Sequence, residues 1–457
     1  MRRVLLCSFL VLASCANRAK QSVALYESGD YAGAAREADN GLASHPDDDG
    51  LWQMRIRAAL ALGDGDGIAK SWATYRERRG SDDAELLREL AIATLGQALG
   101  SPSQRMKITA IEAVQSAEIQ QLAEQVAERM GDDDDRVAAT AAVAVLRGFP
   151  QAPQVASEML RSEDAEARRI AVDGIGRKVG ALAAVDLHKA AADPDPGVRR
   201  AAFRWLAHIK DKEAPAVFER NLRHPDEGVR AAAASGLARI GLGDLQAFAN
   251  KALADKALAV RLAGIELLAA AKRTDELTQL AQSDADPMVA AEAAIAVKRA
   301  DLAQAALDKA ATAERWTIRA GAANTAVRAL GKPATIAFAR KLMTDPEVGV
   351  RLAAARALIA SGDKAGAVAI FEQALATDSA VSAATDLARI GDKRGLEALS
   401  NATRDAKATP DQRAQAAAAH GTARRVTPGL VAALADANGV VRVEAAAVLV
   451  MLAKDPR

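Results

Sequence analysis

Apolar residues recur along most of this chain three or four positions apart, which places them on one face of an α-helix. The same set returns as Val198, Ala202, Leu206 and Ile209, then as Val229, Ala233, Leu237 and Ile240, and again as Val350, Ala354 and Leu358. We find no convincing alternating run of Val, Ile and Thr of the kind that strands require. The pattern therefore predicts an all-α protein.

One arginine in each set marks a repeat of fixed period. Arg168, Arg199, Arg230 and Arg261 lie 31 residues apart, and Arg319, Arg351, Arg413 and Arg442 are later members. The rhythm continues without arginine at Lys107, Ala138, Ala290 and Ser382, which gives about twelve repeats over 101–457. A helical hairpin cannot bury its own apolar face, so a fixed period of this length predicts a solenoid of stacked hairpins.

Each repeat is expected to contain one helix, a turn and a second helix that carries the arginine. Asp195-Pro196, Asp286-Pro287 and Asp345-Pro346 are expected helix starts. An aspartate side chain accepts from the unpaired amides of a first turn, and proline has no amide to leave unpaired there.

These motifs resemble the HEAT repeat family, particularly its short alanine-rich bacterial form, which is also found in phycobilin lyases. The resemblance implies an α-solenoid of HEAT-like hairpins over 101–457. It also implies a ladder of charged pairs between adjacent turns, formed by the arginines and by aspartates six residues before them. Those aspartates are Asp193, Asp255, Asp284, Asp345 and Asp436, although Ala290 leaves Asp284 without its arginine. The arginines are structural in this interpretation.

The segment 15–100 resembles a short run of tetratricopeptide repeats. In that resemblance Leu25 and Tyr26 end one helix, Gly29 to Tyr31 form the turn, Ala34 lies where the helices cross, and Pro46 ends the repeat. The family period of about 34 residues puts Trp52 and Gly63 in a second repeat, although Arg18, Ile68 and Gly80 depart from the pattern. A third helix is expected over 83–99. A generic helical hairpin domain is the alternative.

Residues 1–14 have the organisation of a signal peptide. Arg2 and Arg3 precede an apolar stretch, Val4 to Ala13, that is too short to span a bilayer. Leu12-Ala13-Ser14-Cys15 resembles the lipobox of bacterial lipoproteins, which implies cleavage before Cys15 and its acylation. Ala16, where an aspartate would resemble an inner-membrane retention signal, favours the outer membrane, facing the periplasm. A plain secretory signal is the alternative.

Composition argues against nucleic acid as a partner. The formal net charge of the chain is +1, and loss of Arg2 and Arg3 with the signal would make it −1. Nucleic-acid-binding proteins generally show a basic footprint, and none is present here. Of the two cysteines, Cys7 would be removed and Cys15 acylated, so no disulfide is expected in the mature chain.

Catalytic, metal and cofactor motifs are thin. The histidines, His45, His188, His208, His224 and His420, have no metal-ligand spacing. His224 stands where other repeats have aspartate, so we expect a capping or surface role. The run Asp132 to Asp135 suggests either a calcium site or, more simply, the cap of a helix beginning near Arg136. We expect no catalytic residues, no metal and no cofactor.

Without catalytic, metal or cofactor motifs, the feature most relevant to function is a surface that could bind a partner. HEAT arrays present their second helices on the concave side, which implies a candidate surface made of Arg200, Phe203, Arg204, Ser235, Leu262, Ile265 and Glu266. The sequence thus predicts a non-enzymatic, outer-membrane-anchored scaffold for envelope proteins or peptides. The alternative is a carrier or lyase-like enzyme that binds a lipid, glycan or tetrapyrrole in the concavity.

Overall fold

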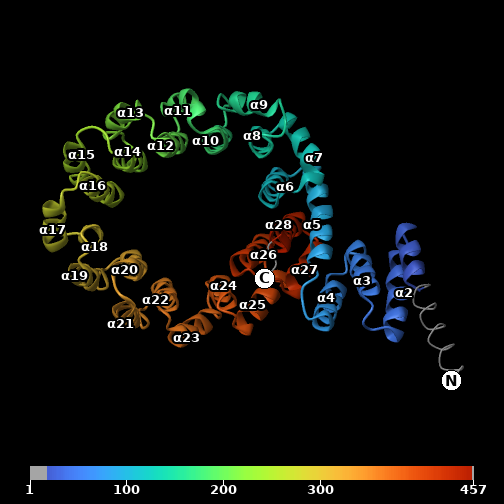
Figure 1. Ribbon diagram of the computed structural model, residues 1–457. Helices are drawn as coiled ribbons and strands as arrows, with labels where there is room; N and C mark the ends of the chain where they lie inside the picture. The colour runs from blue at the N-terminus through green and yellow to red at the C-terminus, as the bar shows by residue number, and fades with distance from the viewer. Residues whose placement is uncertain (1–17, 455–457) are drawn as a thin grey trace, which may run out of the picture. The chain divides into compact units, whose positions relative to one another are not determined.

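A computed structural model describes residues 18–454, and within that range every regular element is a helix (Figure 1). The all-α prediction is confirmed. The signal peptide and Cys15 lie outside the described residues. Contacts divide the chain into two compact units: unit 1 holds the described residues up to Val126 together with those from Ala380 onward, and unit 2 holds Ala127–Ser379.

Unit 2 is a row of helical hairpins in which each second helix packs on the second helix of the next hairpin, as α10 does on α12 and α12 on α14. Within this unit the odd-numbered helices line the outer edge of the row and the even-numbered helices line the inner edge (Figure 1). Its elements are η2 (Arg129–Gly131), α8 (Asp135–Ala144), α9 (Ala152–Met159), α10 (Ala165–Val179), η3 (Gly180–Ala183), α11 (Ala184–Ala190), α12 (Pro196–His208), α13 (Ala214–Asn221), α14 (Glu227–Ile240), α15 (Leu245–Leu253), α16 (Leu258–Ala270), α17 (Thr274–Ser283), α18 (Pro287–Ala296), α19 (Ala300–Ala310), α20 (Trp316–Ala329), α21 (Lys332–Leu342), α22 (Val348–Ser361) and α23 (Lys364–Ala374).

Unit 1 joins two stretches that are distant in sequence. After helical residues 18–27, its first stretch contains α2 (Tyr31–Ser44), α3 (Asp49–Ala61), α4 (Gly65–Arg79), α5 (Ala84–Leu99), α6 (Gln104–Ala117), η1 (Gln120–Leu122) and part of α7 (Ala123–Glu128). Its second stretch contains α24 (Ala380–Arg389), α25 (Lys393–Arg404), α26 (Pro410–Ala423), α27 (Pro428–Ala432), η4 (Ala433–Ala435) and α28 (Gly439–Lys454).

The repeat frame is confirmed helix by helix. Every position of the 31-residue rhythm, from Lys107 on α6 to Arg442 on α28, lies in the first turn of a separate even-numbered helix, including Ala290 on α18 and Ser382 on α24. Val198, Ala202 and Leu206 are fully buried on α12. A regular apolar stripe on each second helix thus produces the predicted α-solenoid of HEAT-like hairpins.

Two of the three expected helix starts are confirmed and one is wrong. Asp195 caps α12 by accepting from the amide of Val198 at 3.0 Å, and Asp286 caps α18 by accepting from the amide of Met288 at 2.9 Å. Helix α22, however, begins at Val348, after Glu347. The Asp345 carboxylate accepts from the Glu347 amide at 2.9 Å instead, because its two oxygens also bind an arginine of the previous repeat.

The hairpins before α5 repeat one turn 34 residues apart. Gly29 and Gly63 have φ of 86° and 69°, a conformation that glycine adopts without strain. The next residues, Asp30 and Asp64, cap α2 and α4 by accepting from amides three residues on, at 2.7 and 2.8 Å. The expected third helix is α5. The tetratricopeptide resemblance and the boundary at residue 100 remain predictions.

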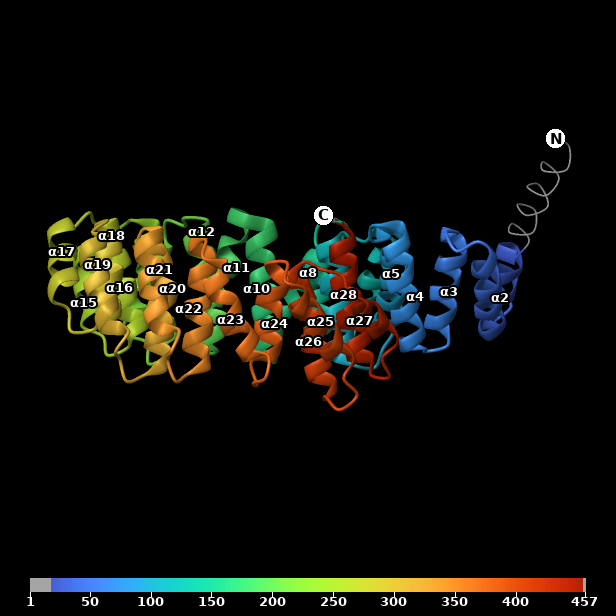
Figure 2. The ribbon, with the colours of Figure 1, turned by 90° about the horizontal axis from the view of Figure 1, so that it is seen from below.

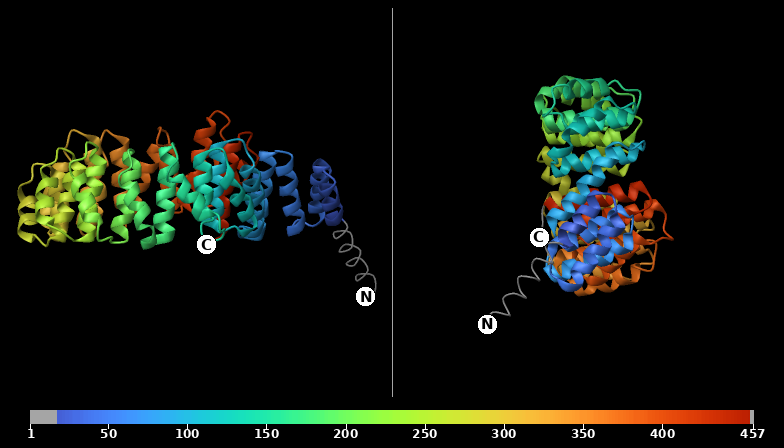
Figure 3. Two further views of the ribbon diagram at one scale, coloured as in Figure 1. Left: turned by 90° about the horizontal axis from the view of Figure 1, so that it is seen from above. Right: turned by 90° about the vertical axis from the view of Figure 1, so that its right-hand side faces the viewer.

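Helix α28 packs on α5 and α6, and α27 packs on α4 (Figures 1 and 2). This joining of the two stretches was not predicted from the sequence. Ion pairs accompany it: Arg105 meets Asp411 at 2.5 Å, Lys454 meets Glu118 at 3.2 Å, and Arg404 pairs with Asp66. Figure 3 shows α2–α5 and the C-terminal helices from other sides. None of the helices between residues 18 and 454 is both long and apolar enough to cross a lipid bilayer.

Candidate functional site: a cavity in unit 1

The predicted concave surface of unit 2 is wrong for two of its residues. Phe203 is fully buried and packs edge-on against Phe218 of α13, with ring centroids 5.0 Å apart, and Ile265 is 4% exposed. Both side chains fill the contact between the two helices of a hairpin or between neighbouring hairpins, so neither is available to a partner. Both apolar residues were expected on the exposed face of their helices, whereas they lie on a buried face.

The remaining residues of that surface are accessible. Arg200, Arg204 and Glu266 are exposed, and Ser235 and Leu262 are half-buried. Arg204 donates to the Asp173 carboxylate, which also accepts from the indole nitrogen of Trp205 at 2.8 Å. The exposed guanidinium of Arg204 is thus already paired with Asp173 of the previous repeat, and its position does not indicate what a partner would be.

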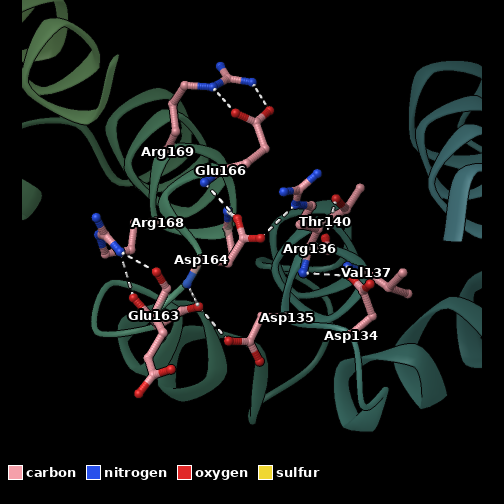
Figure 4. Close-up of polar contacts among 12 residues, drawn as sticks. Asp134, Asp135, Arg136, Val137, Thr140, Glu163, Asp164, Glu166, Arg168 and Arg169 are labelled. Carbon is pink, nitrogen blue, oxygen red and sulfur yellow. Dashed lines mark hydrogen bonds and ion pairs between the residues drawn. The ribbon is translucent and has the colours of Figure 1, made fainter. Parts of the chain in front are cut away.

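The ladder of charged pairs is present. The Nε and Nη2 atoms of Arg168 donate to the two oxygens of Asp193 at 2.8 and 2.9 Å, and Arg230 binds Asp255 at 2.7 and 2.9 Å in the same way. Each Nη1 donates to backbone carbonyls of its own turn, as Arg168 does to Ser162 and Glu163 (Figure 4). The arrangement ties each turn to the next, so these arginines are structural.

The ladder departs from the expected partners where the sequence changes. Arg261 pairs with Asp286 at 2.5 Å, not with Asp284, whose carboxylate accepts from the Asp286 amide at 2.8 Å. In the repeat after Arg199 the aspartate is replaced by His224, and Arg199 donates to the Asn221 side chain at 3.4 Å instead. The Nδ1 of His224 accepts from the Asp226 amide at 3.1 Å, and Asp226 is the residue that caps α14, so His224 supports the turn before the helix and is not itself the cap.

The acidic run before α8 performs a capping function. Asp134 accepts from the amides of Arg136 and Val137 at 3.0 and 3.2 Å (Figure 4). Arg136 in turn donates to Asp164 of the next turn at 2.8 Å. Among the residues that the structure describes, no group of three or more His, Cys, Asp or Glu side chains is placed to hold a metal ion.

A cavity of about 820 Å³ lies within unit 1, and the sequence did not indicate it. Its walls come from α3, α5 and the turn between η4 and α28, with Tyr26 and Tyr31 at one side. The two tyrosine rings contact each other at a centroid distance of 5.1 Å, and burial raises the pKa of the Tyr26 hydroxyl. The nearby Leu62 is 48% exposed, so the cavity has an aromatic and apolar side.

The cavity wall also carries charged residues, and two of them, Arg57 and Glu89, lie close enough to Tyr26 to act on its hydroxyl. Arg57 on α3 donates through Nε and Nη2 to the two oxygens of Glu89 on α5, at 2.8 and 2.6 Å. The hydrogen bond from Arg57 holds the pKa of Glu89 below its usual range. Asp436 is bound by Arg413 at 2.8 and 3.0 Å. These pairs hold α3 to α5 and one repeat to the next, because bidentate guanidinium–carboxylate contacts constrain both distance and orientation.

Arg442 is the remaining charged group that lines this cavity. Its Nη1 donates to the carbonyls of Asp436 and Ala437 at 2.7 and 3.1 Å, as the ladder arginines do in their own turns. No described carboxylate lies against the Nε and Nη2 edge. The signal that could have found this site was the last arginine of the 31-residue rhythm; what it faces depends on helices more than 300 residues earlier.

The comparisons with known proteins concern the fold. Residues 152–238 match a family model of HEAT repeats. A search of curated proteins finds no match.

Solved structures of Kap121p resemble the chain over most of its length. With Kap121p bound to Pho4p the identity is 14%, 86% of this chain and 47% of that chain are covered, and the TM-score is 0.37. The complex with Nup53p and the karyopherin complex with the extreme C-terminus of the protein phosphatase Cdc14p both have an identity of 13% and a TM-score of 0.37. In both, 86% of this chain and 47% of that chain are covered. The chain spans about half the length of those proteins, and so loose a superposition supports no inference about what it binds.

Proposed function

We propose that this chain is a non-enzymatic scaffold that binds other proteins or peptides. The cavity of unit 1 is the observation that carries the proposal. It is concave, walled by packed helices and held by a bidentate ion pair, and its wall offers both aromatic rings and guanidinium groups to one occupant. Preformed concave sites with a few fixed polar groups are suited to binding because little order is lost when they are filled.

The carrier or lyase-like alternative is less well supported. A lipid or tetrapyrrole needs a largely apolar chamber, whereas this wall includes Arg57, Glu89, Asp436 and Arg442. Its acids and bases are mostly engaged with one another rather than left for proton transfer. A polar wall of this kind suits the mixed side chains of a polypeptide better.

We also propose that the scaffold is held at the outer membrane, facing the periplasm, by acyl chains on Cys15. The support is the sequence Leu12 to Cys15 behind a short apolar core. Several acyl chains anchor stably, since each buried methylene contributes about 0.8 kcal/mol. The test is the intact mass of detergent-extracted protein, expected to start at Cys15 with a diacylglyceryl group added. An unmodified mass or another first residue removes the anchor and leaves the solenoid unaffected.

Site-specific crosslinking tests the scaffold. A photo-crosslinking amino acid at Gln97, an exposed residue of the cavity wall, should yield reproducible crosslinked proteins in the native envelope. The same amino acid at Lys212, an exposed residue of unit 2 that does not line the cavity, serves as the control. Equal patterns from the two positions would contradict the cavity as the binding site, and no protein crosslink from either would contradict the scaffold.

A further inference from the structure

Arg442 differs from most of the ladder arginines in what its guanidinium meets. Four of them, Arg168, Arg230, Arg319 and Arg413, donate through both Nε and Nη2 to an aspartate of the following repeat, at 2.7 to 3.0 Å. Arg442 has the same place in its helix and the same bonds from Nη1 to its own turn. No bond from its Nε or Nη2 to a described carboxylate accompanies them, and Arg442 lines the cavity.

The two carboxylates that line the cavity, Glu89 and Asp436, are already bound by other arginines, so neither occupies the Nε and Nη2 atoms of Arg442. Glu89 is taken by Arg57, and Asp436 is taken by Arg413, each through two hydrogen bonds. The Nη1 bonds fix the plane of the Arg442 guanidinium before any ligand arrives, and a guanidinium held in this way matches the two oxygens of a carboxylate.

We infer that the cavity binds a polypeptide partner through a carboxylate that Arg442 receives in the manner of a following repeat's aspartate. This inference rests on the proposed scaffold function and names the chemistry of its partner. The carboxylate comes from an Asp or Glu side chain or from a chain's C-terminus. Apolar neighbours of that carboxylate contact Tyr26, Tyr31 and Leu62, which line the same cavity.

Arg351 offers a matched control within the same chain. Its Nη1 donates to the carbonyls of Asp345 and Pro346 at 2.7 and 2.9 Å, so its local bonds equal those of Arg442. Among the described residues it too has no carboxylate partner, and it does not line the unit 1 cavity. Arg351→Gln and Arg442→Gln therefore remove the same bonds from the fold, and only the second removes the guanidinium from the cavity.

The experiment uses the full chain and a random nonapeptide library on beads, made once with free C-terminal carboxylates and once as C-terminal amides. Wild-type protein should enrich peptides that carry a carboxylate, from the free-acid set alone if the C-terminus is bound and from both sets if Asp or Glu is bound. Affinities of enriched peptides, measured by fluorescence polarisation, should fall at least tenfold for Arg442→Gln and less than twofold for Arg351→Gln. Arg442→Lys keeps the positive charge but lacks the two parallel N–H donors of a guanidinium, so its loss of affinity should be intermediate. This variant also tests the inference if Arg442→Gln does not fold.

Two results would overturn the inference. The first is enrichment of peptides that have no carboxylate and that wild type, Arg442→Gln and Arg442→Lys bind equally well. It would contradict recognition of a carboxylate by Arg442 and would still agree with a protein-binding function. The second, no enrichment from either library, would also contradict that recognition, and the scaffold would then be decided by the crosslinks from Gln97.

Discussion

Unit 2 and unit 1 are built from the same kind of hairpin, yet they are held together differently. In unit 2 each helix packs on helices that are its neighbours in sequence, and its charged pairs join residues about one repeat apart, as with Arg230 and Asp255. In unit 1 the decisive contacts join α28 to α5 and α6, and ion pairs cross more than 300 residues. The cavity that we propose as a binding site lies in unit 1, where surfaces of different origin meet.

This difference indicates where, in a repeat protein, an arginine of the ladder can bind a partner. Within the row of similar hairpins, the carboxylate of a turn is in most repeats bound by the arginine of the preceding turn, as Asp193 is by Arg168 and Asp255 by Arg230. Where the row meets a different structure, as at Arg442, the same arginine faces no such carboxylate among the described residues. A structural residue thereby becomes a candidate binding residue without any change in its own sequence context.

The largest expected effect comes from placing a carboxylate in each core. Leu206 on α12 and Leu449 on α28 are both fully buried, and substitution of either by Asp should cost several kcal/mol of unfolding free energy, since an unpaired buried charge has no compensation. Hydrogen exchange should increase in α10 to α14 for Leu206→Asp. For Leu449→Asp it should increase in α5 and α6 as well as in α28.

Lys212→Ala, at an exposed position, is the control and should change stability by less than about 0.5 kcal/mol. If Leu449→Asp left exchange in α5 and α6 unaltered, the two stretches of unit 1 would not depend on each other as their contacts indicate.

The ladder should show the next largest effect. Arg230→Ala leaves the carboxylate of Asp255 without its partner in a pair whose side chains are 9% and 14% exposed, so we expect a loss of about 3 kcal/mol in urea unfolding. Arg351→Ala removes an arginine that binds only backbone carbonyls and should cost clearly less. Similar losses for the two variants would show that the turn carbonyls, not the carboxylate, account for the ladder's contribution.

Acid should weaken unit 1 through one histidine. His420 on α26 is fully buried; its Nδ1 donates to the Ala416 carbonyl at 2.9 Å and its Nε2 accepts from the Thr427 hydroxyl at 2.8 Å. Burial lowers its pKa from 6.5 to about 4. Between those values the unfolded chain binds a proton that the folded chain does not, so stability falls as pH falls from about 6.5 to about 4, by about 3 kcal/mol.

His420→Gln should flatten this part of the stability profile relative to wild type. The comparison between the two proteins cancels the opposite contributions of Glu112 and Glu444, whose pKa values burial raises. Parallel profiles of urea midpoint against pH would show that His420 does not titrate as its burial requires.

The smallest effect is expected in the hairpins before α5. Gly29→Ala and Gly63→Ala each force a side chain into a left-handed backbone conformation, which should cost about 1 kcal/mol. Nothing else lies within contact of an added Cβ at either glycine, so the two costs should be nearly equal. Unequal thermal shifts would indicate that the two turns are not equivalent members of one repeat.

Repetition made much of the fold predictable from residues alone. The rhythm through Arg168, Arg199 and Arg230 located the second helices, and it did so even at Ala290 and Ser382, because burial of the stripe and not the arginine defines the helix face. Capping by Asp134 and Asp195 followed from local chemistry, which involves only two or three neighbouring residues.

The errors arose where one more layer of packing decided the outcome. Phe203 was expected on the surface and is buried against Phe218, because α13 of the next hairpin covers that side of α12. Asp284 stands six residues before Ala290 and was expected to lack its arginine; it accepts from the Asp286 amide, and Asp286 is the carboxylate that binds Arg261. Spacing along the chain cannot rank two acids that lie two residues apart.

The sequence by itself determined the all-α class, the hairpin period and the order in which one repeat follows the next, because each helix in the row meets neighbours that are close in sequence and nearly identical in pattern. Only the tertiary structure decided that α28 packs on α5 and α6 and that Arg442 lines a cavity with Tyr26 and Arg57. Those contacts join surfaces that no period relates. They depend on side chains of two stretches that are distant in sequence and that pack on each other within unit 1.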